Sequence, residues 1–214
     1  MNRNKFLVNL VTGFVKVTGV LPALIFFKPK VIRVGKRSIP KPAIIVSNHR
    51  SLMDFAFYLL IFPFKTIRFL MAEVLFAKGK LFSWFLSALG GIKVDRDSRD
   101  FSFVSDAIEV LDKKGYLGIF PEARLPVNGK PFPFTVSTAF IATHSDAQIV
   151  PVFTKGNYGI TKRAVAVIGE PFYLTDYLKD NCSEEEQLQH LTDILHDKVY
   201  ELEKQISKDA SDAK

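Results

Sequence analysis

The chain has almost no cysteine. Its 214 residues include a single one, Cys182, so a disulfide framework within the chain is excluded and a reducing compartment is the natural inference. Cys182 lies in a polar stretch, where we expect no nucleophilic role. The sequence also lacks a zinc-ligand pattern, an RNP-like aromatic strand and a basic recognition helix. We therefore expect no metal site and no binding to nucleic acid.

Acidic residues are scarce in the first half of the chain. Residues 1–100 contain 17 Lys and Arg against 5 Asp and Glu, whereas residues 101–214 contain 12 against 17. A basic half with apolar neighbours can face anionic lipid or phosphorylated small molecules, although a solvated basic face would give the same composition. The chain also has 20 Phe against 6 Tyr and 1 Trp. This bias fits a deep apolar core, a lipid-facing surface or a channel for an acyl chain.

The N-terminal stretch Phe6–Phe27 is apolar, but Lys16 interrupts it near its midpoint and the segment 19–22 breaks it again. A signal peptide and a full transmembrane helix both fit this pattern poorly. An interfacial helical hairpin fits it, and so does a helix packed on the core. We expect the hairpin, and divide the chain into a membrane-associating helical segment, residues 1–30, and a larger domain, residues 31–214.

Short apolar runs alternate with helical patterns along the larger domain. The expected strands are Ala43–Val46, Ile67–Met71, Ile92–Val94, Tyr116–Phe120, Ile149–Phe153 and Ala164–Gly169. The expected helices are Phe55–Phe64, Leu81–Leu89, Phe101–Lys113, Val136–Thr143 and Ser183–Lys208, the last with a capping box of Ser183 and Glu186. Strands that alternate with helices predict an α/β fold, a single domain with a mixed, mostly parallel sheet flanked by helices.

A candidate active site follows the first expected strand, in the segment Asn48–Asp54. Ligands of open α/β sheets bind beyond the carboxyl ends of strands, which is where His49 falls. Five residues separate His49 from Asp54, an arc of about 140° on a helix, so the two cannot share a helical face. They can meet if His49 lies in the turn before the helix and Asp54 in its first turn. Ser51 is the expected N-cap of that helix.

The same segment has a plainer interpretation. Ser51 and Asp54 have the spacing of a capping box, so the carboxylate of Asp54 could merely accept backbone N–H groups. His49 would then be an ordinary surface residue of the turn. On local grounds both interpretations stand.

Four blocks of the sequence, in order and over about half of the chain, resemble the motifs of the glycerolipid acyltransferase family, to which the 1-acylglycerol-3-phosphate acyltransferases belong. The blocks are Asn48–Asp54, Gly91–Arg96, Phe120–Arg124 and Ile149–Val152. Ala123 departs from the family pattern because a Gly usually follows the Glu of the third block, and Ser137 stands where a Gly is common. These departures bear on the identity of the acceptor more than on the type of reaction.

The resemblance implies roles for particular residues. His49 would be the general base and Asp54 the carboxylate that orients it, a pairing suited to removing a proton from an attacking hydroxyl. No G-x-S-x-G elbow is present, so a covalent acyl-enzyme is not indicated. The residues expected to bind the substrate, chiefly the phosphate and glycerol of an acceptor, are Asn48, Arg96, Glu122, Arg124 and Pro151.

The expected reaction moves a fatty acyl group from acyl-CoA or acyl carrier protein to a lysophospholipid, with 1-acyl-sn-glycerol-3-phosphate as acceptor and phosphatidic acid as product. No cofactor is expected. Residues 31–214 would form the acyltransferase domain, associated with membrane phospholipid on the cytoplasmic face. Two alternatives remain: an inactive lipid-binding module at a membrane surface, and an acyl thioester hydrolase that uses water.

Overall fold

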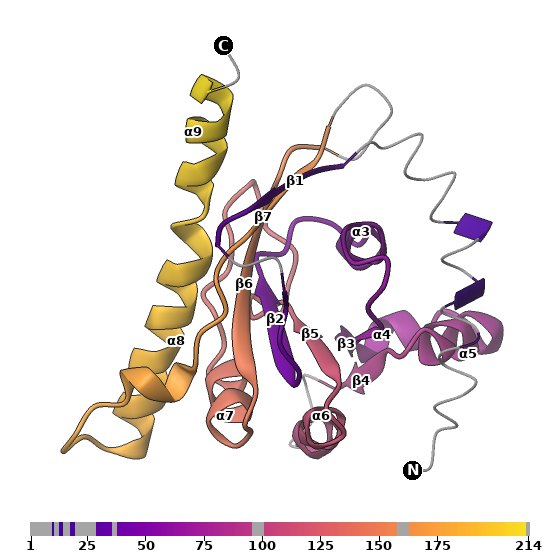
Figure 1. Ribbon diagram of the computed structural model, residues 1–214. Helices are drawn as coiled ribbons and strands as arrows, with labels where there is room; N and C mark the ends of the chain where they lie inside the picture. The colour runs from indigo at the N-terminus through magenta and orange to yellow at the C-terminus, as the bar shows by residue number, and fades with distance from the viewer. Residues whose placement is uncertain are drawn as a thin grey trace.

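A computed structural model of the chain describes residues 10, 13–14, 18–19, 29–35, 38–95, 101–157 and 163–212. Its strands form one sheet in the order β1-β7-β6-β2-β5-β3-β4 (Figure 1). The strands are β1 (Lys30–Arg33), β2 (Ala43–Ser47), β3 (Ile67–Ala72), β4 (Ile92–Val94), β5 (Tyr116–Ile119), β6 (Gln148–Lys155) and β7 (Val165–Ile168). Neighbouring strands are parallel except β6 and β7, so the predicted α/β fold with a mixed, mostly parallel sheet is confirmed.

Helices cover both faces of the sheet. They are α3 (Asp54–Ile61), α4 (Glu73–Phe76), α5 (Lys80–Ala88), α6 (Ser102–Asp112), α7 (Ser137–Thr143), α8 (Glu184–Tyr200) and α9 (Glu203–Asp212), with a short 3-10 helix η2 (Leu174–Tyr177). One apolar core lies between the sheet and α6, α7 and α8, and a second lies between the other face and α3 (Figure 1).

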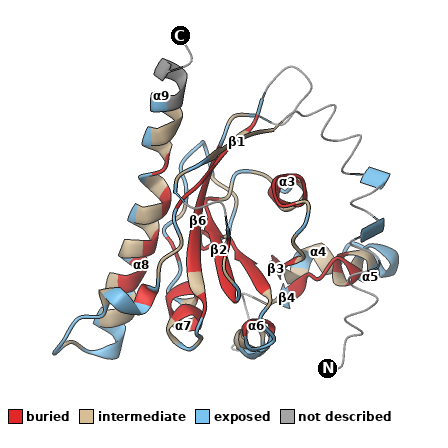
Figure 2. Cartoon of the chain, viewed as in Figure 1, coloured by how far each residue is buried: buried red, intermediate tan, exposed pale blue. Residues whose placement is uncertain are grey.

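The central strands are buried on both faces. Every residue of β2 is buried, and so are all four residues of β5 (Figure 2). A strand covered by helices on both sides has no solvent face, which explains why these segments read as continuous apolar runs rather than as alternating ones. The most shielded part of the sheet therefore ends at the edge where the candidate site lies.

One glycine of β5 makes room for an aromatic side chain. A Cβ atom on Gly118 would lie 2.3 Å from the ring of Phe69 on the neighbouring strand β3. The ring of Phe69 can therefore lie flat against the sheet, where it stacks on Phe120 with 5.8 Å between ring centroids. Tyr58 of α3 meets both rings edge-on.

The C-terminal helix differs from its prediction. Its start is confirmed, since Ser183 and Glu186 form the expected capping box. One continuous helix to Lys208 is wrong, because α8 ends at Tyr200 and α9 begins at Glu203. The N–H of Leu202 donates to the carbonyl of Val199 three residues back, which tightens the chain there. This turn places the buried Leu202 against Gly169, a packing contact that a straight helix would not make.

The elements β1, α4 and η2, of four residues each, were not expected. The predicted hairpin of Phe6–Phe27 falls almost wholly outside the described residues. No helix in the described part of the chain is both long enough and apolar enough to cross a bilayer.

Gly118→Ala is expected to lower the free energy of unfolding by about 1–3 kcal/mol, because the new methyl group overlaps the ring of Phe69. Phe69→Leu supplies the matched second change, since the smaller side chain leaves space for that methyl group. In urea unfolding, the double variant should lose less stability than the two single losses together. Purely additive losses would contradict the close contact.

Candidate active site

The turn after β2 brings His49 and Asp54 together. Nδ1 of His49 lies 2.7 Å from Oδ2 of Asp54. The same oxygen accepts hydrogen bonds from the backbone N–H groups of Arg50, at 2.6 Å, and Ser51, at 2.9 Å. His49 lies before the helix and Asp54 begins α3, which is the turn-then-helix geometry that the five-residue spacing predicts.

Both interpretations of this segment describe part of the structure. Asp54 accepts backbone N–H groups, as a capping residue does, and also binds the imidazole through one oxygen. The predicted N-cap at Ser51 is wrong, because the cap position is Met53 and no side chain caps the helix. The hydroxyl of Ser51 instead accepts from the N–H of Met53, within the turn. The helix starts later because the carboxylate of Asp54 organises the turn that precedes it.

Asn48 ties this turn to a neighbouring strand. Its side-chain Oδ1 accepts from the backbone N–H of Thr154 at 2.8 Å, and its Nδ2 donates to the carbonyl of Thr154 at 3.0 Å. Both residues are almost fully buried. Thr154 lies near the carboxyl end of β6, so the Asn48 amide fixes the end of β2 against it. Buried polar groups that satisfy one another in this way hold the turn in one place.

Glu122 supports His49 from another strand end. It follows β5, is only 2% exposed, and its Oε1 accepts from the backbone N–H of His49 at 3.0 Å. The hydroxyl of Tyr200, on α8, donates to the same oxygen at 3.1 Å. The other oxygen, Oε2, is buried and has no hydrogen-bond partner within the described part of the chain, although the backbone N–H of Phe132 also acts on the carboxylate. A buried carboxylate oxygen without a donor is a candidate acceptor for a substrate hydroxyl.

Burial also shifts proton affinity at this position. It raises the pKa of Glu122 above its ordinary value, against the opposing effect of the hydrogen bonds from His49 and Tyr200. The pKa of Tyr200 is raised as well, first by burial and then by the charge of Glu122 beside it. The Tyr200 hydroxyl therefore stays a hydrogen-bond donor throughout the physiological range of pH.

Two contacts fix the imidazole of His49: Phe120 stacks on one face of the ring, and Asp54 bonds to its Nδ1. Its ring stacks on Phe120 at 4.6 Å between centroids and 18° between planes. With Nδ1 donating to Asp54, the neutral ring presents Nε2 as an acceptor, and nothing in the described part of the chain bonds to that nitrogen. The side chain is 15% exposed, so a ligand can reach it.

The other predicted site residues lie at different places. Arg96 falls outside the described residues. Arg124 is exposed on the turn after β5, close to Glu122 in the chain, while Pro151 is buried within β6 opposite Val46 of β2. Arg50, which was not singled out in the sequence, is exposed next to His49 and donates to the carbonyl of Gly156.

Ala123 takes the backbone conformation that the family's glycine would favour. Its φ is +56°, in the left-handed region, although a Cβ makes that region unfavourable. The N–H of Arg124 donates to the carbonyl of Glu122 at 2.7 Å, which closes a tight turn around Ala123. The turn that carries Glu122 and Arg124 therefore forms despite the substitution.

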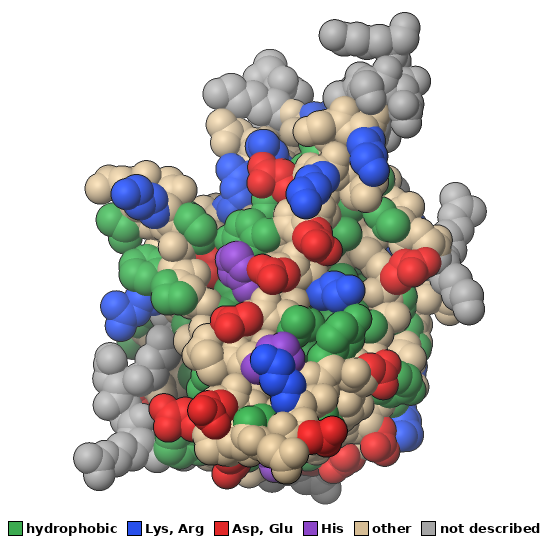
Figure 3. Space-filling view, turned by 90° about the vertical axis from the view of Figure 1, so that its left-hand side faces the viewer, with side chains coloured by type: hydrophobic (Ala, Val, Ile, Leu, Met, Phe, Trp, Pro, Cys, Tyr) green, Lys and Arg blue, Asp and Glu red, His purple; other side chains and the backbone are tan. Residues whose placement is uncertain are grey.

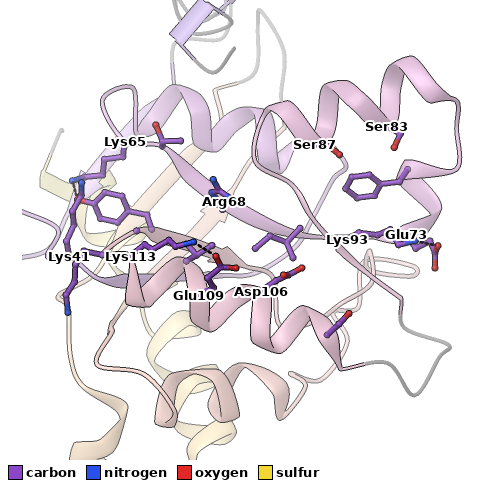
Figure 4. Close-up of a pocket in the computed structure, with 18 of the residues that line it drawn as sticks. Lys41, Lys65, Arg68, Glu73, Ser83, Ser87, Lys93, Asp106, Glu109 and Lys113 are labelled. Carbon is purple, nitrogen blue, oxygen red and sulfur yellow. Dashed lines mark hydrogen bonds and ion pairs between the residues drawn. The ribbon is translucent and has the colours of Figure 1, made fainter. Parts of the chain in front are cut away.

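A large groove lies elsewhere in the described part of the chain. It has a volume of about 1320 Å³ and is lined by residues of α4, α5, α6 and strands β3 to β5, such as Lys65, Arg68 and Tyr116 (Figure 4). Its Lys93 and Lys113 pair with Glu73 and Glu109. None of the candidate site residues lines this groove, so the two are separate.

The sequence profile described as Acyltransferase matches residues 30–155, which is more than half of the chain. The chain belongs to the acyltransferase family. This confirms the family that the four motifs predicted, and the match includes His49, Asp54, Glu122 and Arg124.

Two named proteins are similar to this acyltransferase, one in sequence and one in structure. Human 1-acyl-sn-glycerol-3-phosphate acyltransferase beta is 26% identical over 113 residues, which cover 52% of this chain and 41% of the human protein. The match therefore spans less than half the length of that relative. The crystal structure of the 1-acyl-sn-glycerophosphate (LPA) acyltransferase PlsC from Thermotoga maritima has a TM-score of 0.65 at 24% identity, covering 95% of this chain and 84% of that one. The second likeness shows that the fold is shared.

Two contacts of the acyltransferase site had no signal in the sequence. Thr154 and Tyr200 lie 106 and 78 residues from the side chains that they bind, Asn48 and Glu122. Neither belongs to a motif, and no local periodicity marks either of them. Only the packing of β6 and α8 brings them to the site.

Glu122→Gln is expected to change how stability depends on pH. Because burial raises the pKa of Glu122 in the folded state, the folded chain holds this proton more tightly than the unfolded chain. The contribution of Glu122 to stability is therefore full below the ordinary carboxyl pKa of 4.5 and is lost as pH rises through the raised value. The stability of the variant relative to the native chain should grow with rising pH, measured by urea unfolding at several pH values.

Glu186→Gln provides a control of opposite sign. The backbone N–H and the hydroxyl of Ser183 lower the pKa of Glu186, so that carboxylate adds stability only above its ordinary pKa. The relative stability of this variant should fall as pH rises. The same sign for both variants would contradict the environment described for Glu122.

Ala123→Gly is expected to raise the free energy of unfolding by about 0.5–1 kcal/mol, because glycine adopts a positive φ without strain. For a chain of this size that corresponds to about 2 °C in melting temperature. Ala77→Gly is the matched control: its φ is −77°, and its stability should fall. An equal loss in both variants would argue against strain at Ala123.

Proposed function

We propose that the protein transfers a fatty acyl group from a thioester to the free hydroxyl of a lysophospholipid, with 1-acyl-sn-glycerol-3-phosphate as the acceptor. The proposal rests on the geometry of the pair formed by His49 and Asp54. Nδ1 of His49 lies 2.7 Å from the buried carboxylate of Asp54, while the ring itself remains partly exposed. A fixed imidazole with an open nitrogen, beside a carboxylate, is the arrangement of a general base.

The proposed step uses His49 and the two substrates alone. Nε2 of His49 takes the proton from the acceptor hydroxyl as the hydroxyl oxygen forms a bond to the thioester carbonyl carbon. The carbon–sulfur bond then breaks, and the imidazolium returns the proton to the departing thiolate. Asp54 holds the ring in the tautomer that presents Nε2 and stabilises the imidazolium while it exists.

No covalent acyl-enzyme is part of this proposal. Cys182 lies just before α8, where its sulfur contacts the carbonyl of Lys179 and the side chain of Gln187. It therefore has no contact with His49. The donor would be acyl-CoA or acyl carrier protein, as the family resemblance implies.

The acceptor would be held by cations and by Glu122. Arg124 is exposed on the same sheet edge as His49, and a guanidinium bonds two phosphate oxygens at once. Oε2 of Glu122, buried and without a donor, could accept a hydrogen bond from the glycerol part of the acceptor. We include Arg96 in this role on the family motif alone. The names of the two relatives support a 1-acylglycerol-3-phosphate acceptor.

We place the enzyme at the cytoplasmic face of a membrane, because the proposed acceptor is a membrane lipid and the single cysteine indicates a reducing compartment. The apolar stretch Phe6–Phe27 and the basic first half of the chain support this location.

His49→Ala is expected to reduce acyl transfer by about 10²–10⁴-fold, since the step loses its general base. The assay would incubate the full chain with radiolabelled acyl-CoA and a panel of lysophospholipids, and separate diacyl product from free fatty acid. His144→Ala is the matched control, because His144 is exposed and stacks only on Phe140 of its own helix.

Full transfer activity in His49→Ala would overturn the mechanism. Free fatty acid as the main product, with every acceptor, would show a thioester hydrolase instead. Preference for an acceptor without a phosphate would keep the mechanism but exclude the proposed role of Arg124.

A further inference from the structure

Helix α5 has apolar side chains that no core explains. Leu86 and Ala88 of α5 are buried. Nearer the amino end of the helix, Leu81 is 80% exposed and Trp84 53% exposed, although both are large and apolar. Leu81, Trp84 and Phe85 are spaced three and four residues apart, so they form one stripe along the helix, called here the outward stripe.

The polar side of α5 does not face the same way. Ser83 and Ser87 line the large groove and lie on the helix face that borders it (Figure 4). Near the amino end of the helix, Leu81 and Trp84 therefore pack neither on a core nor in the groove. A soluble helix ordinarily buries such large apolar side chains, so their exposure indicates something that covers them.

The charges next to the stripe are mostly positive. The α4–α5 segment and β4 contain three lysines, Lys78, Lys80 and Lys93, and one acidic residue, Glu73, which pairs with Lys93. Lys78 and Lys80 are exposed at the amino end of α5, next to Leu81. The face on the far flank, around α8, differs, since Lys, Arg, Asp and Glu side chains are interspersed across it (Figure 3).

We infer that the α4–α5 segment contacts an anionic lipid bilayer, with the outward stripe entering the interface and Lys78 and Lys80 facing the lipid headgroups. Trp is enriched at the boundary between water and hydrocarbon, and lysines beside it can extend to phosphate groups. A short helix with an apolar face and flanking lysines is suited to lie in that boundary.

A protein partner fits the stripe less well. A stable protein interface buries about 800 Å² on each partner. The three side chains of the outward stripe cannot supply that area. Lysines are also depleted in protein interfaces, whereas each adds to binding at an anionic membrane. A bilayer needs no matching shape, so a small patch suffices.

The contact would deepen the proposed function by bringing lipid to the site. Helix α4 starts directly after the carboxyl end of β3, at the sheet edge where β2 presents His49. On that edge Leu52 and Met53 are 55% and 52% exposed, in the turn between His49 and Asp54. An acceptor that stays partly in the bilayer would then have a short path to the imidazole.

Trp84 is the only tryptophan of the chain, so its fluorescence reports on this helix alone. With mixed phosphatidylcholine–phosphatidylglycerol vesicles, the emission of the full chain should shift to shorter wavelength, and brominated lipids should quench it. Trp84 that stays open to acrylamide while the chain is bound to vesicles would overturn the inference. So would shielding of Trp84 before vesicles are added, because a second copy or another part of this chain would then cover the stripe.

Variants separate this contact from catalysis. Leu81→Asp should weaken partitioning onto the mixed vesicles by about tenfold or more, and Lys78→Gln and Lys80→Gln by about fivefold each. Leu178→Asp is the matched control: Leu178 is 55% exposed and follows η2, which packs on α7 and α8. Leu81→Asp should keep its rate on a water-soluble short-chain acceptor. Equal losses of partitioning in both leucine variants would overturn the inference, whether or not the chain transfers acyl groups.

Discussion

One buried oxygen atom, Oδ2 of Asp54, accepts hydrogen bonds from the imidazole of His49 and from the next two backbone N–H groups. A carboxylate without exposure to water is stable only when such donors surround it. The turn therefore has one favourable conformation, in which the imidazole cannot rotate away from the carboxylate. Asn48 and Glu122 then fix this turn to the ends of β6 and β5. Three polar side chains of the site, Asn48, Asp54 and Glu122, are thus also structural supports.

Much of the fold follows from the apolar pattern of the sequence. The central strands were predictable because burial on both faces makes them short, continuous apolar runs, as in β2. The start of α8 was predictable because Ser183 and Glu186 form a local motif. The break after Tyr200 was not, because it depends on Leu202 meeting Gly169 of a distant segment. Local sequence patterns do not indicate contacts between segments that are far apart in the chain.

Some features of the candidate site could likewise be predicted from the sequence, and others could not. The contact between His49 and Asp54 follows from a spacing of five residues, which the sequence displays. The start of α3 at Asp54 does not, because a Ser three residues earlier imitates a cap. Thr154 and Tyr200 were beyond prediction, since their partners are far away in the chain. The motifs thus indicate the candidate residues, and the tertiary structure shows what holds them.

The hydrogen bond between Tyr200 and Glu122 has a consequence for the order in which the enzyme is made. Synthesis proceeds from the N-terminus, so His49, Asp54 and Glu122 leave the ribosome well before α8 does. Until Tyr200 has emerged and α8 has docked, the carboxylate of Glu122 lacks the hydrogen bond that Tyr200 donates. The growing chain can build the sheet first, since all of its strands precede α8, but the candidate site becomes complete only when α8 has docked.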